Sequence, residues 1–218
     1  SFNDKYNDDN ATGKFLNDNQ KNKMLSFENW DNIIKTLSEK KDRNTSEDTL
    51  LLVMTIHRHY PLRNDLGDME IITQSSYDKL TEEQKEDRNR IIKNQKGMKF
   101  ILTKYKTAGT YHKKEIMITN DKVKKFLTGW FKTHKTNKYL IQNKFGQPLG
   151  NSALAVLMNN TGSIYNDGNN IGSTSMRKSY LTNTFSGAKS EMNKMANVMC
   201  HSVGTAMHLY VKEDGGVI

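Results

Sequence analysis

Residues 91–118, IIKNQKGMKFILTKYKTAGTYHKKEIMI, decide which architecture the sequence predicts. Their composition is typical of three short strands, which are Ile91-Ile92, Lys99 to Leu102 and Glu115 to Ile118. Gly97 and the pair Ala108-Gly109 are typical of the turns between them. The segment therefore predicts a small antiparallel β-sheet.

Helical patterns precede this sheet. From Ser26 to Leu37, apolar residues recur at spacings of three and four, which predicts one buried face of a helix. Thr45 and Asp48 resemble a capping box ahead of a second, buried helix that carries the apolar run Leu50 to Ile56. Pro61 ends this helix. The charged stretch 75–90 predicts an exposed helix or loop insertion.

Helical patterns also follow the sheet. We expect helices over 120–131 and 150–158, with a short extended piece at 139–141 between them. The sequence NNTGSIYNDGNNIG (159–172) predicts a Gly/Asn-rich loop, and the remainder predicts helices broken near Gly187 and Cys200. The predicted class is mainly α with a small antiparallel β-sheet.

A chain of 218 residues predicts one principal domain. Residues 1–23 are rich in Asn, Asp and Lys and are expected to form a flexible arm or linker remnant, with a domain over 24–212 and a short tail over 213–218. Nothing in the sequence resembles a membrane span or signal peptide, so we expect a soluble intracellular protein. The single cysteine, Cys200, excludes an internal disulfide and cysteine-cluster metal sites.

The chain is strongly basic. Its 33 Lys and Arg residues against 24 Asp and Glu residues give a formal charge of +9, a balance that favours nucleic acid as the partner. No tight cluster of Asp, Glu and His is present, because His57 and His59 point apart on a helix and Asp65 with Asp68 is a weak pair. This disfavours a two-metal nuclease, so fixed arginines, which grip phosphate bidentately, are the better candidates.

Four local sequences, in this order, resemble the tyrosine recombinase (integrase) family. They are HRHYPLRNDLGDMEI (57–71), ILTKYKTAGTYHKKEIMI (101–118), GSTSMRKSYLTNTF (172–185) and MCHSVGTAMHLY (199–210). FGQPLGNSALAVLM (145–158) also resembles the turn and helix that precede the third sequence in this family. The resemblance covers about Ser26 to Lys212 and implies the family's catalytic-domain fold, that of a DNA breaking-rejoining enzyme.

The resemblance also implies a set of site residues. Arg63 and Arg177 match the two catalytic arginines, with Asp65 near the family's acidic position. His201 matches the histidine nine residues before the nucleophile, which is Tyr210. The catalytic lysine matches Lys106, which is preferred to Lys104 because a threonine follows it. Thr174 stands where the family usually has a histidine, which puts proton handling in doubt.

The implied activity is site-specific recombination of double-stranded DNA through a covalent 3′-phosphotyrosyl intermediate, without metal or other cofactor. Family members usually act as homotetramers on two DNA sites, although only eight residues follow Tyr210 here. Three alternatives stay open: a type IB topoisomerase or telomere resolvase with the same chemistry, a non-catalytic DNA-binding homologue, and a metal-dependent nuclease. The Asn- and Lys-rich composition suggests an AT-rich genome, as of a virus or mobile element, and we expect the catalytic domain of a longer protein.

Overall fold

The computed structural model of the chain describes residues 24–94 and 97–198. The elements follow one another as α3 (Phe27–Glu39), α4 (Thr45–His57), η1 (Asn64–Asp68), β1 (Glu70–Thr73), α5 (Gln74–Asp78), α6 (Glu82–Glu86), β2 (Arg90–Asn94), β3 (Gly97–Leu102), α7 (Ala108–Tyr111), β4 (Lys114–Met117), α8 (Asp121–Thr133), α9 (Asn151–Tyr165) and α10 (Ser173–Val198). The fold is mostly helical with one small sheet, which confirms the predicted class at that level. Within the described ranges, no helix is long and apolar enough to cross a membrane.

Helix α4 lies at the centre of the core. Every residue from Thr49 to His57 is buried, so this helix has no solvent face along its last nine residues. The predicted capping box is one residue too late: Asn44 is the N-cap, and its side chain and that of Glu47 cap each other's backbone N–H groups. Asn44 takes the N-cap position because asparagine is among the most favourable N-cap residues. Thr45 then lies inside the first turn of the helix.

Glu47 also ties three helices together. Its carboxylate accepts a hydrogen bond from Lys40 Nζ at 2.6 Å, just beyond α3, and another from the hydroxyl of Tyr165 at the end of α9. These hydrogen bonds, that from Lys40 foremost, lower the pKa of Glu47 to about 2. The carboxylate is therefore ionised at neutral pH, and it fixes the ends of α3 and α9 against the start of α4.

The sheet is mixed rather than antiparallel, which corrects the prediction. Its strand order is β1-β2-β3-β4, and the pairs β2–β3 and β3–β4 are antiparallel as expected. Strand β1, which the sequence did not predict, pairs with β2 in parallel because the short helices α5 and α6 carry the chain back to the same end. One sheet face joins the main core through Ile91 and Phe100, while α5 covers the other through Tyr77.

The last two helices are longer than predicted. Helix α9 continues to Tyr165, through half of the stretch expected to be a loop, and Gly162 is required for close packing instead of a turn. A Cβ atom there would lie 2.7 Å from the Cβ of Ile171. Helix α10 passes through Gly187 without a break, because a glycine inside a helix costs only about 1 kcal/mol.

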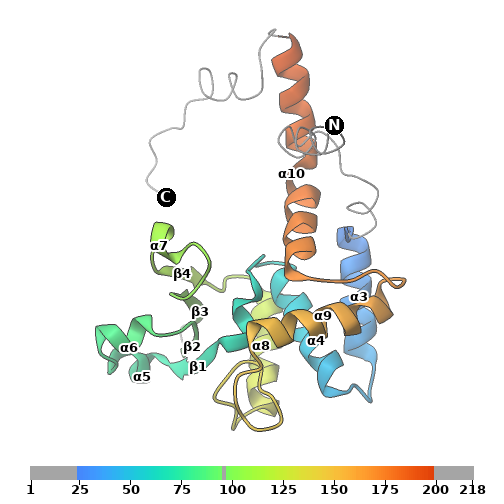
Figure 1. Cartoon of the computed structure of the whole chain (residues 1–218). Coiled ribbons are helices and arrows are strands. Elements are labelled where there is room, and N and C mark those ends of the chain that lie inside the picture. Colours follow the sequence, from blue (N-terminus) through green and yellow to red (C-terminus); the bar gives the residue numbers. More distant parts are fainter. Residues whose placement is uncertain (1–23, 95–96, 199–218) are drawn as a thin grey trace, which may run out of the picture.

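Figure 1 shows how these parts are arranged. The sheet and helices α5 to α7 lie on one side, helices α3, α4, α8 and α9 lie on the other, and α10 projects away from both. The predicted helices over 26–37 and 120–131 are confirmed as α3 and α8, with Ser26 and Asn120 as N-caps. Residues 1–23, Cys200 and the predicted tail lie outside the described residues.

Candidate phosphate site

Arg63 is held where the buried helix α4 gives way to a short 3₁₀ turn. The residue adopts an extended backbone and is the N-cap of η1. Gly150 N–H, at the start of α9, donates to the carbonyl of Gly67 at 3.1 Å, and a Cβ on Gly67 would lie 2.7 Å from the Gly150 backbone. This close approach fixes η1 against α9 and so limits where the Arg63 side chain can reach.

Arg177 lies on the first two turns of α10, the only part of that helix that is anchored in the core among the described residues. Met176 and Ser179 on either side of it are fully buried. The Leu25 N–H donates to Ser179 Oγ at 2.9 Å, and Asn183 Nδ2 donates to the Leu25 carbonyl at 2.9 Å. The segment before α3 therefore clamps α10, and this fixes Arg177 in place.

The side chains of Arg63 and Arg177 come close enough for their charges to interact. The carboxyl group of Asp65 interacts with both arginines. Burial and repulsion by Arg63 both lower the pKa of Arg177, and attraction by Asp65 opposes them. The carboxyl of Asp65, 7% exposed, has its pKa raised by burial, against the attraction of Arg63 and Arg177. The cluster thus carries more positive than negative charge, in a place where water screens it poorly.

One donor in this cluster has no partner. Arg177 Nε is buried and makes no hydrogen bond to any described residue. A buried polar group left without a partner costs about 1–3 kcal/mol, and more when it is charged. An anion with several acceptor oxygens, such as a phosphate, would satisfy this donor and relieve the repulsion between the two arginines.

Thr174 shares the start of α10 with Arg177. The two residues are three apart, so their side chains follow one another on the same helix face. Thr174 is exposed to solvent. Its hydroxyl can therefore donate or accept a hydrogen bond at the rim of the site, but it cannot act as a base near neutral pH.

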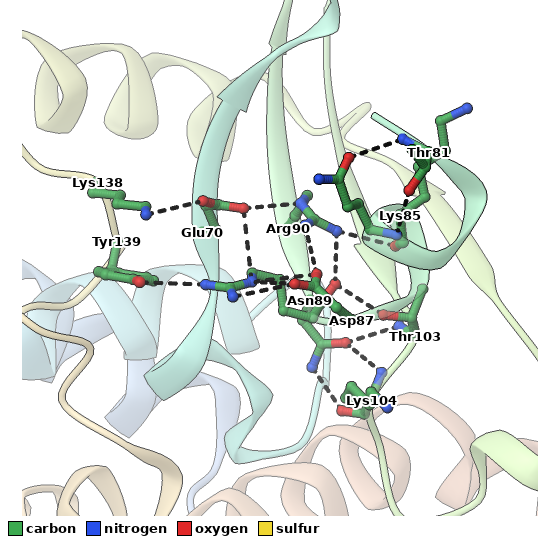
Figure 2. A network of polar contacts seen from close by, with 12 residues as sticks. Glu70, Thr81, Lys85, Asp87, Asn89, Arg90, Thr103, Lys104, Lys138 and Tyr139 are labelled. Carbon is green, nitrogen blue, oxygen red and sulfur yellow. Dashed lines mark hydrogen bonds and ion pairs between the residues drawn. The ribbon is translucent and has the colours of Figure 1, made fainter. Parts of the chain in front are cut away.

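Lys106 lies in the turn that links β3 to β4, as the sequence predicted, although a helical turn, α7, takes the place of the expected glycine turn. Figure 2 shows how the start of this turn is held. The side-chain Oδ1 of Asn89 accepts from the backbone N–H groups of Thr103 and Lys104, both at 2.8 Å, and Asn89 Nδ2 donates to the Lys104 backbone carbonyl. The backbone of Lys104 is thus clamped, two residues before Lys106.

An ion-pair network around the buried Arg90 supports this clamp from the sheet side. Arg90 is 2% exposed and binds Glu70 at 2.9 Å and Asp87 at 2.6 Å (Figure 2). Arg88 Nη1 donates to the hydroxyl of Tyr139 at 3.3 Å. These contacts join β1, β2 and the segment after α8. Both lysine side chains, Lys104 and Lys106, remain exposed, so their positions leave the choice between them open.

His57 belongs to the site although the sequence gave it no role. It ends α4, is fully buried, and its Nδ1 hydrogen bonds to the Val53 carbonyl at 3.0 Å, whereas Nε2 has no partner among the described residues. Burial above all lowers the pKa of His57 to about 4, and repulsion by Arg177 contributes. The only available sequence signal was a titratable residue at the end of a run that is apolar except for Thr55.

The structure thus brings together Arg63, Arg177 and Asp65, adds His57, and leaves Thr174 at the edge. Lys106 is placed on an anchored turn, with no contact to the arginines among the described interactions. His201 and Tyr210 lie outside the described residues, so the expected nucleophile and its neighbouring histidine stay predictions.

Comparisons with known proteins add one structural similarity. No protein-family model matches the chain, and no curated protein matches it. A crystal structure of XerA recombinase is similar to 88% of this chain, with a TM-score of 0.49 and 12% sequence identity. The chain spans 59% of the length of that XerA recombinase chain.

Replacing His57 should flatten the dependence of stability on pH. Its pKa is near 4 in the folded protein and 6.5 when unfolded, so the unfolded chain takes up more protons below pH 6.5. Unfolding free energy should then fall by about 2 kcal/mol from pH 7 to pH 5 because of this residue alone. In urea titrations at pH 7 and pH 5, the unfolding free energies of His57→Leu and His57→Asn should each fall by that much less than the wild-type value.

The pH dependence of the variant must be compared with that of the wild type, because the lowered pKa of His59 makes the unfolding free energy of both proteins depend on pH. An unchanged slope in both variants would show that His57 titrates normally in the folded protein.

Inorganic phosphate should stabilise the wild-type protein through the arginine cluster. At constant ionic strength, with chloride as the comparison anion, phosphate at tenfold its dissociation constant should add about 1.4 kcal/mol to the unfolding free energy. Arg177→Met should abolish this gain. Arg58→Met is the matched control, because Arg58 pairs with Asp31 on the surface. An equal phosphate response in wild type and Arg177→Met would rule out a phosphate site at Arg177.

Proposed function

We propose that this chain is the catalytic domain of a tyrosine recombinase, which cleaves and rejoins double-stranded DNA through Tyr210. The observation that carries this proposal is the pair Arg63 and Arg177, two arginines that repel each other. The buried Nε of Arg177 has no hydrogen-bond partner among the described residues. Such a pair is costly in isolation and becomes favourable once a phosphodiester lies between the two guanidinium groups.

Each group has a defined part in the proposed reaction. The Tyr210 hydroxyl oxygen attacks the scissile phosphorus, forming a phosphotyrosyl bond to the 3′ side while the bond from phosphorus to the 5′ oxygen breaks. Arg63 and Arg177 stabilise the negative charge that develops on the phosphoryl oxygens, with His201 as a third donor. Lys106 gives a proton to the departing 5′ oxygen, and the tyrosine proton passes to solvent or to a nearby histidine. Attack by another 5′ hydroxyl reverses the step.

The charge of the whole chain supports a DNA partner. A formal charge of +9 favours association with phosphate backbones and predicts affinity that falls steeply with salt. Assembly of four protomers on two sites follows from the family resemblance, whereas an origin in a virus or mobile element is suggested by the Asn- and Lys-rich composition. Thr174, at the family's histidine position, is the specific reason to retain a non-catalytic DNA-binding homologue as the second candidate.

Tyr210→Phe should bind DNA nearly as tightly as wild type but form no covalent adduct, because only the nucleophilic oxygen is lost. The measurement is capture of a nicked suicide DNA substrate, in which the leaving strand diffuses away, followed by denaturing electrophoresis. Arg177→Ala should slow capture by at least about a hundredfold, as expected for a lost transition-state charge. Thr174→Ala should raise the free-energy barrier to capture by about 1 kcal/mol, the contribution of one hydrogen bond.

The outcomes of this experiment separate the candidates. Wild type that binds but never forms an adduct favours the DNA-binding homologue, and loss of cleavage in EDTA favours a metal-dependent nuclease. Adduct formation with relaxation of supercoiled DNA, but without strand exchange, favours a topoisomerase. Normal adduct yield from Tyr210→Phe would remove Tyr210 as the nucleophile.

Lys106→Ala should be slow on ordinary DNA and recover on a substrate in which sulfur replaces the bridging 5′ oxygen, since a thiolate leaves without a proton. Lys104→Ala is the matched control from the same turn and should behave almost as wild type on both substrates. The measurement is single-turnover cleavage. Sulfur rescue of Lys104→Ala in place of Lys106→Ala would move the proton donor to Lys104.

A further inference from the structure

A second candidate site lies between the start of α4 and helix α8. A groove of about 760 Å³ runs between the first half of α4 and one stripe of α8. Asp48 and Leu51 line it from α4, and Arg43, just before α4, forms one wall. Its volume lies within the range of small-molecule sites. Neither the arginine cluster nor Lys106 contributes to it.

An aromatic row forms one side of this groove. Phe126, Trp130 and His134 follow one another at spacings of four along α8 and line the groove. Their rings are close to parallel: Phe126 and Trp130 are inclined by 24°, and Trp130 and His134 by 18° with centroids 3.9 Å apart. His134 therefore covers one face of Trp130, and a further planar ring would stack on a face of the row that these contacts leave open.

The groove also has free positive charge at its rim. Lys122 and Lys125 line it from the first turns of α8, and both are exposed. Neither forms an ion pair with a described residue. Arg43, by contrast, is occupied: its Nε donates to Asp48 at 2.6 Å, and its Nη1 donates to the carbonyls of Leu37 and Lys40. The two lysines are therefore the cations available to a ligand.

Gly129 keeps the groove open. It lies on the lining stripe of α8, between Phe126 and Trp130, and a Cβ there would meet no atom within 4 Å. Its backbone is helical, so a larger side chain would fill the groove without strain in α8. Any residue other than proline would strengthen this helix, yet at this position its side chain would narrow the groove.

We propose that this groove binds an unpaired nucleotide, with the base stacked on the aromatic row of α8 and its phosphate at Lys122 and Lys125. Planarity and negative charge are the two properties that the lining selects, and an unpaired nucleotide has both. A base inside a duplex is stacked on both faces and cannot enter. The nucleotide can be free in solution or part of a single strand, and the proposal does not depend on cleavage by Tyr210.

Tryptophan fluorescence gives a direct test, since the chain has two tryptophans. Trp30 is fully buried and bonded to the Met54 carbonyl, so quenching by a stacked base reports on Trp130. Short oligothymidylate should quench the wild-type protein, and Gly129→Leu should weaken binding about tenfold or more while remaining folded. Lys122→Ala with Lys125→Ala should also weaken it, most strongly at low salt.

Matched controls keep the result specific. Gly187→Leu makes the same change in α10, where a Cβ also meets open space, and Lys132→Ala removes a lysine of α8 that does not line the groove. Both variants should bind oligothymidylate as tightly as the wild type does. Thymidine monophosphate tests the free source, and quenching by it as well would show that one nucleotide suffices.

Three results would overturn the proposal. The first is no quenching by either probe, or quenching that Gly129→Leu leaves unchanged. The second is equal, groove-dependent quenching by a blunt duplex, which has no unpaired base. The third is a change of oligomeric state in Gly129→Leu by sedimentation, which would make the groove an interface between copies of this chain.

Discussion

Burial of α4 on all sides is the constraint on which the rest of the structure depends. A helix with no solvent face along Thr49 to His57 must be covered by several partners, because burial of apolar surface is the main source of stability. Helices α3, α8, α9 and α10 all contact it. Since Arg63 follows α4 and Arg177 lies on a helix that packs against it, covering this one helix also brings the two arginines together.

The arginine cluster destabilises the folded protein, and the packing around it offsets this cost. Three features oppose folding: two like charges, a buried guanidinium donor that no described residue pairs with, and a buried histidine beside them. Met176, Ser179 and the hydrogen bonds from Leu25 keep α10 in place despite this cost. Such pre-arranged strain is common at functional sites, because binding of the right ligand relieves it. An anion is the ligand that this arrangement suits.

Buried charged residues at two other places are paired with opposite charges, in contrast to the arginine cluster. Glu47 joins α3, α4 and α9 through Lys40 and Tyr165, and Arg90 joins β1 and β2 through Glu70 and Asp87. In both networks each buried charge has an opposite charge within hydrogen-bonding distance. These networks are structural supports, whereas the arginines near η1 and the lysines along the groove retain unused capacity for ligands.

The sequence by itself determined the helices with clear periodicity, α3 and α8, and two antiparallel strand pairs, because spacing along the chain encodes which face of an element is buried. It also singled out Arg63, Lys106 and Arg177 as candidate site residues, through the resemblance of their local sequences to the tyrosine recombinase family. Only the tertiary structure decided that β1 joins β2 in parallel, that α9 continues past Gly162, and that His57 lies beside Arg177. Each of these depends on contacts between segments distant in sequence, and local patterns carry no record of such contacts.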